Sequence, residues 1–122
     1  MIESNRASYQ AARKELSSAT MDVRTYDALH AMDYLVLARL QLAQDKAANL
    51  VVDEVAGIRK VNVENFVAAY ALAAIPARFA LERGDWMGAA VLKLRPADLA
   101  WNKFPQAEAV LVYARGLGAA HR

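Results

Sequence analysis

The chain has 122 residues, which is enough for one domain with a hydrophobic core. Its 15 basic and 13 acidic residues give a formal net charge of +2, and because the basic residues are dispersed, a nucleic-acid-binding patch is not indicated. Cysteine is absent, which excludes disulfides and thiolate metal sites, while 27 alanines and only three prolines favour a helical protein.

The first half of the chain predicts three helices. The first covers residues 2–18 and is amphipathic, with one face formed by Ile2, Tyr9, Ala12 and Leu16. The second, about residues 25–43, is apolar nearly all round and should therefore be buried on two sides. A turn at "QDKAA" leads into the third, whose expected buried face is Ala48, Val51, Val52, Val55 and Ile58. Asn62 is expected to end this helix and to cap the next one.

The second half predicts three more helices and no strand, since no alternating pattern occurs. The fourth helix, about residues 63–83, contains Pro76, which should kink it because proline lacks the N–H that bonds the Leu72 carbonyl. A short fifth helix is expected to end by about Leu94, ahead of Pro96. Pro105 occupies the favoured first-turn position of the sixth helix.

The junction between the fourth and fifth helices, "RGDWMGAA", reads as a tight turn. Gly84 suits the left-handed position after a helix, and Asp85 suits the N-cap of the next helix. Trp86 and Ala89 should face inward and lock these two helices together. The junction is therefore interpreted as structural.

The dipeptide Ala-Arg recurs at positions 38, 77 and 114, at intervals of 39 and 37 residues, each time in the second half of a long helix. Repeats of this length are typical of stacked helical hairpins. The stretch "LERGDWMGAA" resembles the turn of a tetratricopeptide repeat, in which a glycine, a polar residue and an aromatic residue precede a small residue. "LQLAQDKAA" is a looser version of that turn.

A more specific resemblance covers nearly the whole chain. "ESNRASYQAA", "HAMDYLVLARLQLAQDKAA", "FVAAYALAAIPARFALERGDW" and "FPQAEAVLVYARGLGAAHR" are similar to the C-terminal part of a family of large, uncharacterised bacterial tetratricopeptide-repeat proteins. The resemblance implies an all-α, right-handed solenoid of about six helices, with residues 1–122 as one domain and a fragment of a longer solenoid. "LKLRPADLAWNKF" departs from a minimal repeat.

Three arginines, Arg39, Arg78 and Arg115, follow the repeated alanine. In a tetratricopeptide solenoid this position faces the concave groove, where three guanidinium groups would clamp carboxylates of an acidic peptide. Alternatively, they pair with local acids such as Glu82 and Glu108, or extend into solvent.

His30 can share a helical face with Asp27 and Tyr34. These residues form either a polar or weak metal site, or a histidine satisfied by its neighbours that supports helix packing. The second choice is favoured because a metal needs at least three converging ligands. Nothing in the sequence places His121 near these three residues.

These observations favour a non-enzymatic protein-interaction or scaffold module of tetratricopeptide type, without cofactor or metal, that binds a protein or an acidic peptide. The alternative is an enzymatic or small-molecule-binding helical domain with a pocket near His30, Tyr34 and Tyr70. Neither a signal peptide nor a membrane span is evident, so a cytoplasmic protein is expected. Apolar stripes on the two end helices predict self-association.

Overall fold

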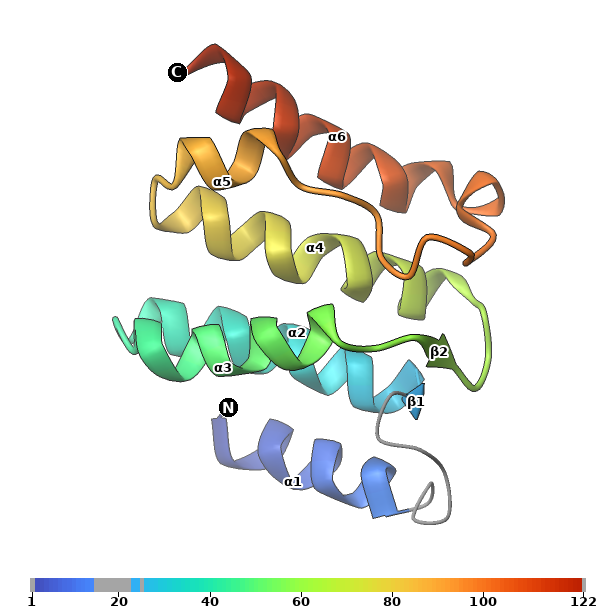
Figure 1. The fold of residues 1–122 in the computed structure, drawn as a ribbon. Coiled ribbons are helices and arrows are strands. Elements are labelled where there is room, and N and C mark those ends of the chain that lie inside the picture. Colours follow the sequence, from blue (N-terminus) through green and yellow to red (C-terminus); the bar gives the residue numbers. More distant parts are fainter. Residues whose placement is uncertain (1, 15–22, 25, 122) are drawn as a thin grey trace.

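The computed structural model describes residues 2–14, 23–24 and 26–121, and this part of the chain is mostly helical (Figure 1). Its elements are α1 (Ile2–Lys14), β1 (Val23–Arg24), α2 (Tyr26–Gln41), α3 (Asp45–Ala56), β2 (Lys60–Val61), α4 (Phe66–Glu82), α5 (Trp86–Ala90), the 3-10 turn η1 (Trp101–Lys103) and α6 (Pro105–Ala120). The predicted all-α class is therefore confirmed. Of the residues expected in the first helix, Leu16 lies outside the described residues.

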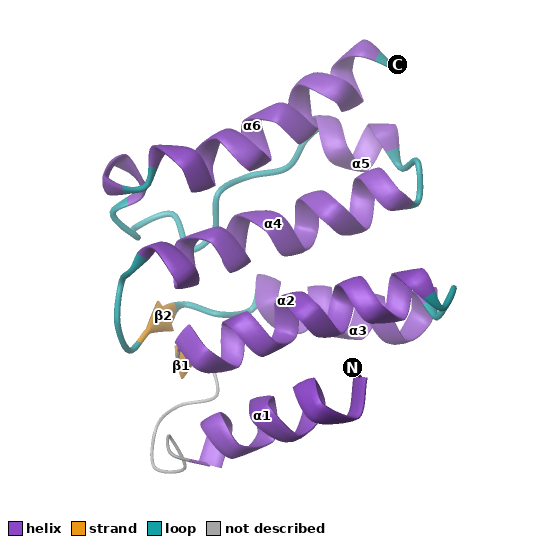
Figure 2. Cartoon of the chain, turned by 180° about the vertical axis from the view of Figure 1, so that it is seen from behind, coloured by secondary structure: helices purple, strands orange, loops and turns teal. Residues whose placement is uncertain are grey.

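The helices form two layers. The first layer contains α1, α2, α4 and α6, which follow one another as packed neighbours (Figure 1). The second layer contains α3, which packs on α2 and α4, and α5, which packs on α4 and α6. Seen from behind, α2, α4 and α6 lie in front of α3 and α5 (Figure 2). Consecutive helices therefore form the hairpins α2–α3 and α4–α5.

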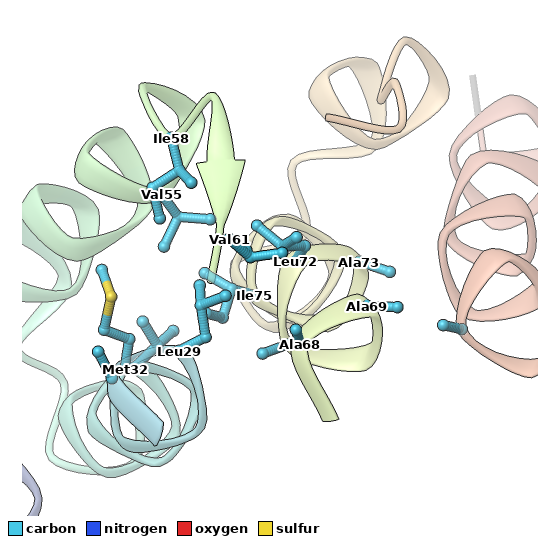
Figure 3. Close-up of a cluster of buried hydrophobic side chains, with 14 of the residues drawn as sticks. Leu29, Met32, Val55, Ile58, Val61, Ala68, Ala69, Leu72, Ala73 and Ile75 are labelled. Atoms are coloured by element: carbon cyan, nitrogen blue, oxygen red, sulfur yellow. The ribbon is translucent and has the colours of Figure 1, made fainter. Parts of the chain in front are cut away.

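The main core lies where α2, α3 and α4 meet. Leu29 and Met32 of α2 and Ile75 of α4 are fully buried there, and Val55 of α3 faces them (Figure 3). Burial of α2 on several sides agrees with its apolar sequence. On α4, the alanine-rich side toward α6 carries no side chain larger than a methyl group at Ala69 and Ala73, which lets the two helices pack closely (Figure 3).

The α4–α5 turn has the expected glycine and cap. Gly84 adopts the left-handed conformation with φ of 65°. The N–H of Asp85 donates to the Ala80 carbonyl at 2.9 Å, and the N–H of Gly84 donates to the Leu81 carbonyl at 3.1 Å. These two bonds define a Schellman closure, which satisfies carbonyl groups that the helix end would otherwise leave unpaired.

The α2–α3 turn closes in the same way. Ala43 takes the left-handed position with φ of 56°, which is uncommon for a residue with a Cβ atom. The Gln44 N–H donates to the Arg39 carbonyl at 2.8 Å, and the Ala43 N–H donates to the Leu40 carbonyl at 3.1 Å. The two hairpins thus share one turn geometry, and Ala43 and Gly84, 41 residues apart, are its equivalent positions.

One boundary prediction is wrong. Asn65, and not Asn62, caps α4, because its Oδ1 accepts the Ala68 N–H at 2.9 Å. The Asn62 side chain instead accepts the Tyr26 N–H at 3.1 Å and so supports the start of α2. The fifth helix ends at Ala90, within the predicted limit of about Leu94, and Leu92 and Leu94 pack against the core from an irregular segment.

The prediction that the chain has no strand is also wrong. β1 and β2 form a parallel pair in which Val23 lies opposite Lys60 and Arg24 lies opposite Val61. Each strand has two residues, which is too short to produce an alternating pattern in the sequence. The pair joins the start of α2 to the segment that leads into α4.

Candidate functional site

The strongest polar contact between α2 and α4 is an ion pair between Asp33 and Arg78. The Arg78 Nη1 donates to the Asp33 carboxylate and, at 3.5 Å, to the Asp33 backbone carbonyl. The Asp33 side chain is 11% exposed and that of Arg78 is 22% exposed, so both charges are largely removed from water. The pair is therefore a partly buried cross-link between the two hairpins.

Burial raises the pKa of the Asp33 carboxyl above its ordinary value of 3.8. The neighbouring Arg78 guanidinium lowers this pKa in part through its charge and its hydrogen bond, and the His30 charge lowers it further. The net shift of the Asp33 pKa is upward, because the loss of hydration outweighs the attraction of the two cations. The ionised form of Asp33 is therefore less favourable in the folded protein than in water.

A groove of about 470 Å³ runs between α4 and α6 next to this pair. Tyr70 on α4 and Tyr113 on α6 line it from the two helices, and Ala74 and Ala77 are its most buried lining residues. The polar lining residues are Arg78, Glu82 and Gln106. The small alanine side chains leave the space that the two tyrosines border.

His30 and Tyr34 lie on α2, exposed to solvent, with their rings in an edge-to-face contact of 4.9 Å between centroids. Asp27 is exposed as well. Within the described ranges, no three histidine, cysteine, aspartate or glutamate side chains are grouped as a metal would require. In the alternative pocket, Tyr70 lines the α4–α6 groove. His30 does not line that groove, and its charge acts on the Asp33 carboxyl.

The three repeated arginines lie in three different surroundings. That they bind one partner together stays a prediction. Arg39 donates from Nη1 to the Ala47 carbonyl of α3 at 3.0 Å, whereas Arg78 pairs with Asp33. Arg115 follows Tyr113 by two residues, about 200° around α6, and so lies away from the groove side.

The reason for this difference is a mismatch of two periods. The equivalent turn positions Ala43 and Gly84 are 41 residues apart, but Arg39 and Arg78 are only 39 apart. A shift of two residues moves a side chain to nearly the opposite face of a helix. The recurring dipeptide therefore does not mark equivalent structural positions.

The residues assigned to the α4–α5 junction have clear local roles. Asp85 accepts the Gly88 N–H at 2.9 Å, and Ala89 is completely buried. Pro76 lies inside α4, which continues to Glu82. Trp86 stacks on His121 at the end of α6, with ring centroids 4.0 Å apart and an interplanar angle of 16°. Trp86 therefore connects α5 to α6, a contact that sequence spacing could not indicate.

Asp33 is a residue of this site that the motifs in the sequence do not single out. The sequence does carry a signal, because a single carboxylate interrupts the mainly apolar stretch "AMDYLVLA" in a helix expected to be buried. A buried carboxylate needs a cation or several hydrogen-bond donors. The sequence could not identify Arg78 as that cation, since the two residues are 45 positions apart.

No family model, curated protein or solved structure matches this chain. In the ranges that the structure describes, none of the helices combines the length and the apolar character needed to cross a membrane.

Proposed function

We propose that this chain is a non-enzymatic interaction module built from helical hairpins of tetratricopeptide type, and that it binds a peptide in the α4–α6 groove. The observation that carries the proposal is the groove itself, which two tyrosines border over a surface of buried alanines. Grooves of this kind accept apolar side chains from a peptide, while a few polar groups orient it. Tyrosine supplies large contact area with little conformational entropy to lose.

The polar side of the groove supports one charged contact. The Arg78 guanidinium has five N–H donors, and the pair with Asp33 uses Nη1. Arg78 lines the groove, and its remaining N–H groups can donate to a single carboxylate of the peptide. The proposed ligand is therefore a mainly apolar peptide with one acidic group, in contrast to a strongly acidic peptide held by three arginines.

A selection from a displayed random peptide library against the purified chain tests the proposal. Ala109 is exposed and lines the groove, so Ala109→Trp fills the groove without overpacking the core. The matched control is Ala119→Trp, an exposed alanine on the same helix. Selected peptides should lose at least about tenfold in affinity for the first variant and bind the second normally, a loss equivalent to about 1.4 kcal/mol.

Two results would contradict the proposal. One is a selection that yields no peptide with measurable affinity for the unmodified chain. The other is a set of peptides whose affinities for Ala109→Trp and Ala119→Trp are equal, because their site would then lie elsewhere.

A further inference from the structure

The second layer of the fold has an unequal pair of helices. α3 has 12 residues, whereas α5 has five, so the hairpin α4–α5 has a much shorter second helix than the hairpin α2–α3. The chain after α5 runs as an irregular segment alongside α4 before it reaches α6 (Figure 1). A segment without a regular helical surface fills the space beside α3 and α4 less completely than two further helical turns would.

A cavity of about 220 Å³ lies at this place. Its deepest side chains are Val55 of α3 and Leu72 of α4, which are 4% and 2% exposed. The other apolar lining comes from α3, α4 and the segment after α5, namely Val52, Ala56, Pro76, Val91 and Leu92. For comparison, a dry apolar cavity of about 150 Å³ in another protein is large enough for benzene.

The polar side of this cavity is entirely cationic. Lys93 and Arg95 are its two charged lining residues, both are exposed, and no acidic side chain lines it. Within the described part of the chain, neither cation has a carboxylate partner, in contrast to Arg78 and Arg83, which pair with Asp33 and Asp45. The cavity therefore combines an apolar interior with two uncompensated positive charges at its rim.

We infer that this cavity binds a small amphipathic anion of the medium-chain fatty acid class. The alkyl chain lies against Val55, Leu72 and Pro76, where it is removed from water, and the carboxylate lies between Lys93 and Arg95. Burial of the methylene groups favours binding, and hydrogen bonds from a charged donor to a carboxylate are stronger than neutral ones. The cavity shares no lining residue with the α4–α6 groove, so this inference is independent of the proposed peptide site.

Calorimetric titration with octanoate tests the inference, with octanol and octylamine as uncharged and cationic probes of equal chain length. Octanoate should bind the unmodified chain, octanol should bind more weakly, and octylamine should bind most weakly because the two cations repel it. The double variant Lys93→Gln with Arg95→Gln should weaken octanoate binding by roughly tenfold or more, because it removes both charged donors to the carboxylate.

Two further variants separate the cavity from general surface charge. Ala56→Trp places a large side chain at an exposed lining position and should abolish octanoate binding without loss of the fold, as checked by circular dichroism. Lys103→Gln removes an exposed cation that does not line the cavity and should leave the affinity unchanged. Absence of octanoate binding to the unmodified chain overturns the inference, and so does equal affinity for octanoate and octylamine or full binding to Ala56→Trp.

Discussion

At the scale of single residues, Asp33 is the most informative position. In the described part of the chain it is the one charged residue that is buried. Removing a carboxylate and a guanidinium from water is unfavourable, and their mutual attraction offsets this only in part. The upward direction of the Asp33 pKa expresses that balance. We therefore expect the pair with Arg78 to act mainly by specifying which face of α2 meets α4.

Arg78→Met should lower the free energy of unfolding by about 3 kcal/mol at pH 7, because it leaves the Asp33 carboxylate buried without its counter-ion. Adding Asp33→Leu should restore most of that loss. Arg83→Met is the control, since Arg83 and Asp45 form an exposed pair at 3.3 Å that contributes at most about 1 kcal/mol. Urea denaturation measures all three; equal losses for Arg78→Met and Arg83→Met would contradict the expectation.

The same pair predicts a pH dependence. The folded-state pKa of Asp33 is raised, so between 3.8 and that higher value the folded protein holds more protons at Asp33 than the unfolded chain. Stability from this residue consequently falls as pH rises through that window. Loss of Arg78 removes a cation that lowers this pKa, so the loss of stability in Arg78→Met should be largest near pH 7 and shrink as the pH falls. A loss of stability in Arg78→Met that grows as the pH falls would contradict this prediction.

At the scale of elements, the hairpin turns and the α5–α6 contact carry most of the specific geometry. The turns after α2 and α4 have the same hydrogen bonds, although one has alanine and the other glycine at the left-handed position. The short α5 is held by close packing on α6, where Gly118 faces the backbone at Trp86 and Ala90. Stability at both places therefore depends on whether a Cβ atom is present, through the backbone conformation in the turns and through close packing at Gly118.

The two turns give opposite expectations for exchange of alanine and glycine. Gly84→Ala should lower the free energy of unfolding by about 1 kcal/mol, because a Cβ atom is disfavoured at positive φ. Ala43→Gly should raise it by up to about 1 kcal/mol, since it relieves that strain, less the entropy that glycine loses on folding. Thermal unfolding compares them. Stabilisation by Gly84→Ala would argue against the left-handed turn.

Two glycines of α6 form a matched pair. A Cβ atom at Gly118 would lie 2.5 Å from the Ala90 nitrogen and 2.6 Å from the Trp86 oxygen, whereas one at Gly116 would have no neighbour within 4 Å. Gly118→Ala should therefore destabilise the protein by about 1–3 kcal/mol. Gly116→Ala should stabilise it by up to about 1 kcal/mol through helix propensity. Similar melting temperatures for both variants would mean that α5 does not pack on α6 this closely.

At the scale of the whole molecule, two layers of helices leave apolar side chains on the outer surface of α6. Val112 and Tyr113 are 51% and 66% exposed and adjacent in sequence. Exposed apolar neighbours on a helix are a common site of association. Self-association stays a prediction, and these two residues of α6 are the surface on which we place it.

We predict that the purified chain forms dimers at high concentration and that Val112→Glu shifts the equilibrium toward the monomer. Val112 does not line the α4–α6 groove, so this variant leaves the proposed peptide site intact. Size-exclusion chromatography with light scattering measures the molar mass. A single monomeric species at millimolar concentration, or an unchanged dimer in Val112→Glu, would count against the prediction.

Much of the fold could be predicted from local patterns. The apolar character of α2, the glycine and aspartate at the α4–α5 turn and Pro105 at the start of α6 all act within a few residues, and the structure has each of them. The candidate site was harder to predict from the sequence. The recurring dipeptide points to Arg78, but in the structure Arg78 pairs with Asp33, and Arg39 and Arg115 lie in different surroundings.

The sequence by itself determined the helical class, the number of helices in the described part and the type of the α4–α5 turn, because helix propensity and capping depend on neighbouring residues. Only the tertiary structure decided that Asp33 meets Arg78, that Trp86 stacks on His121, and that a short α5 leaves a cavity beside Lys93 and Arg95. Contacts between distant residues depend on how each helix is rotated against its neighbours, and a shift of two residues reverses a helix face.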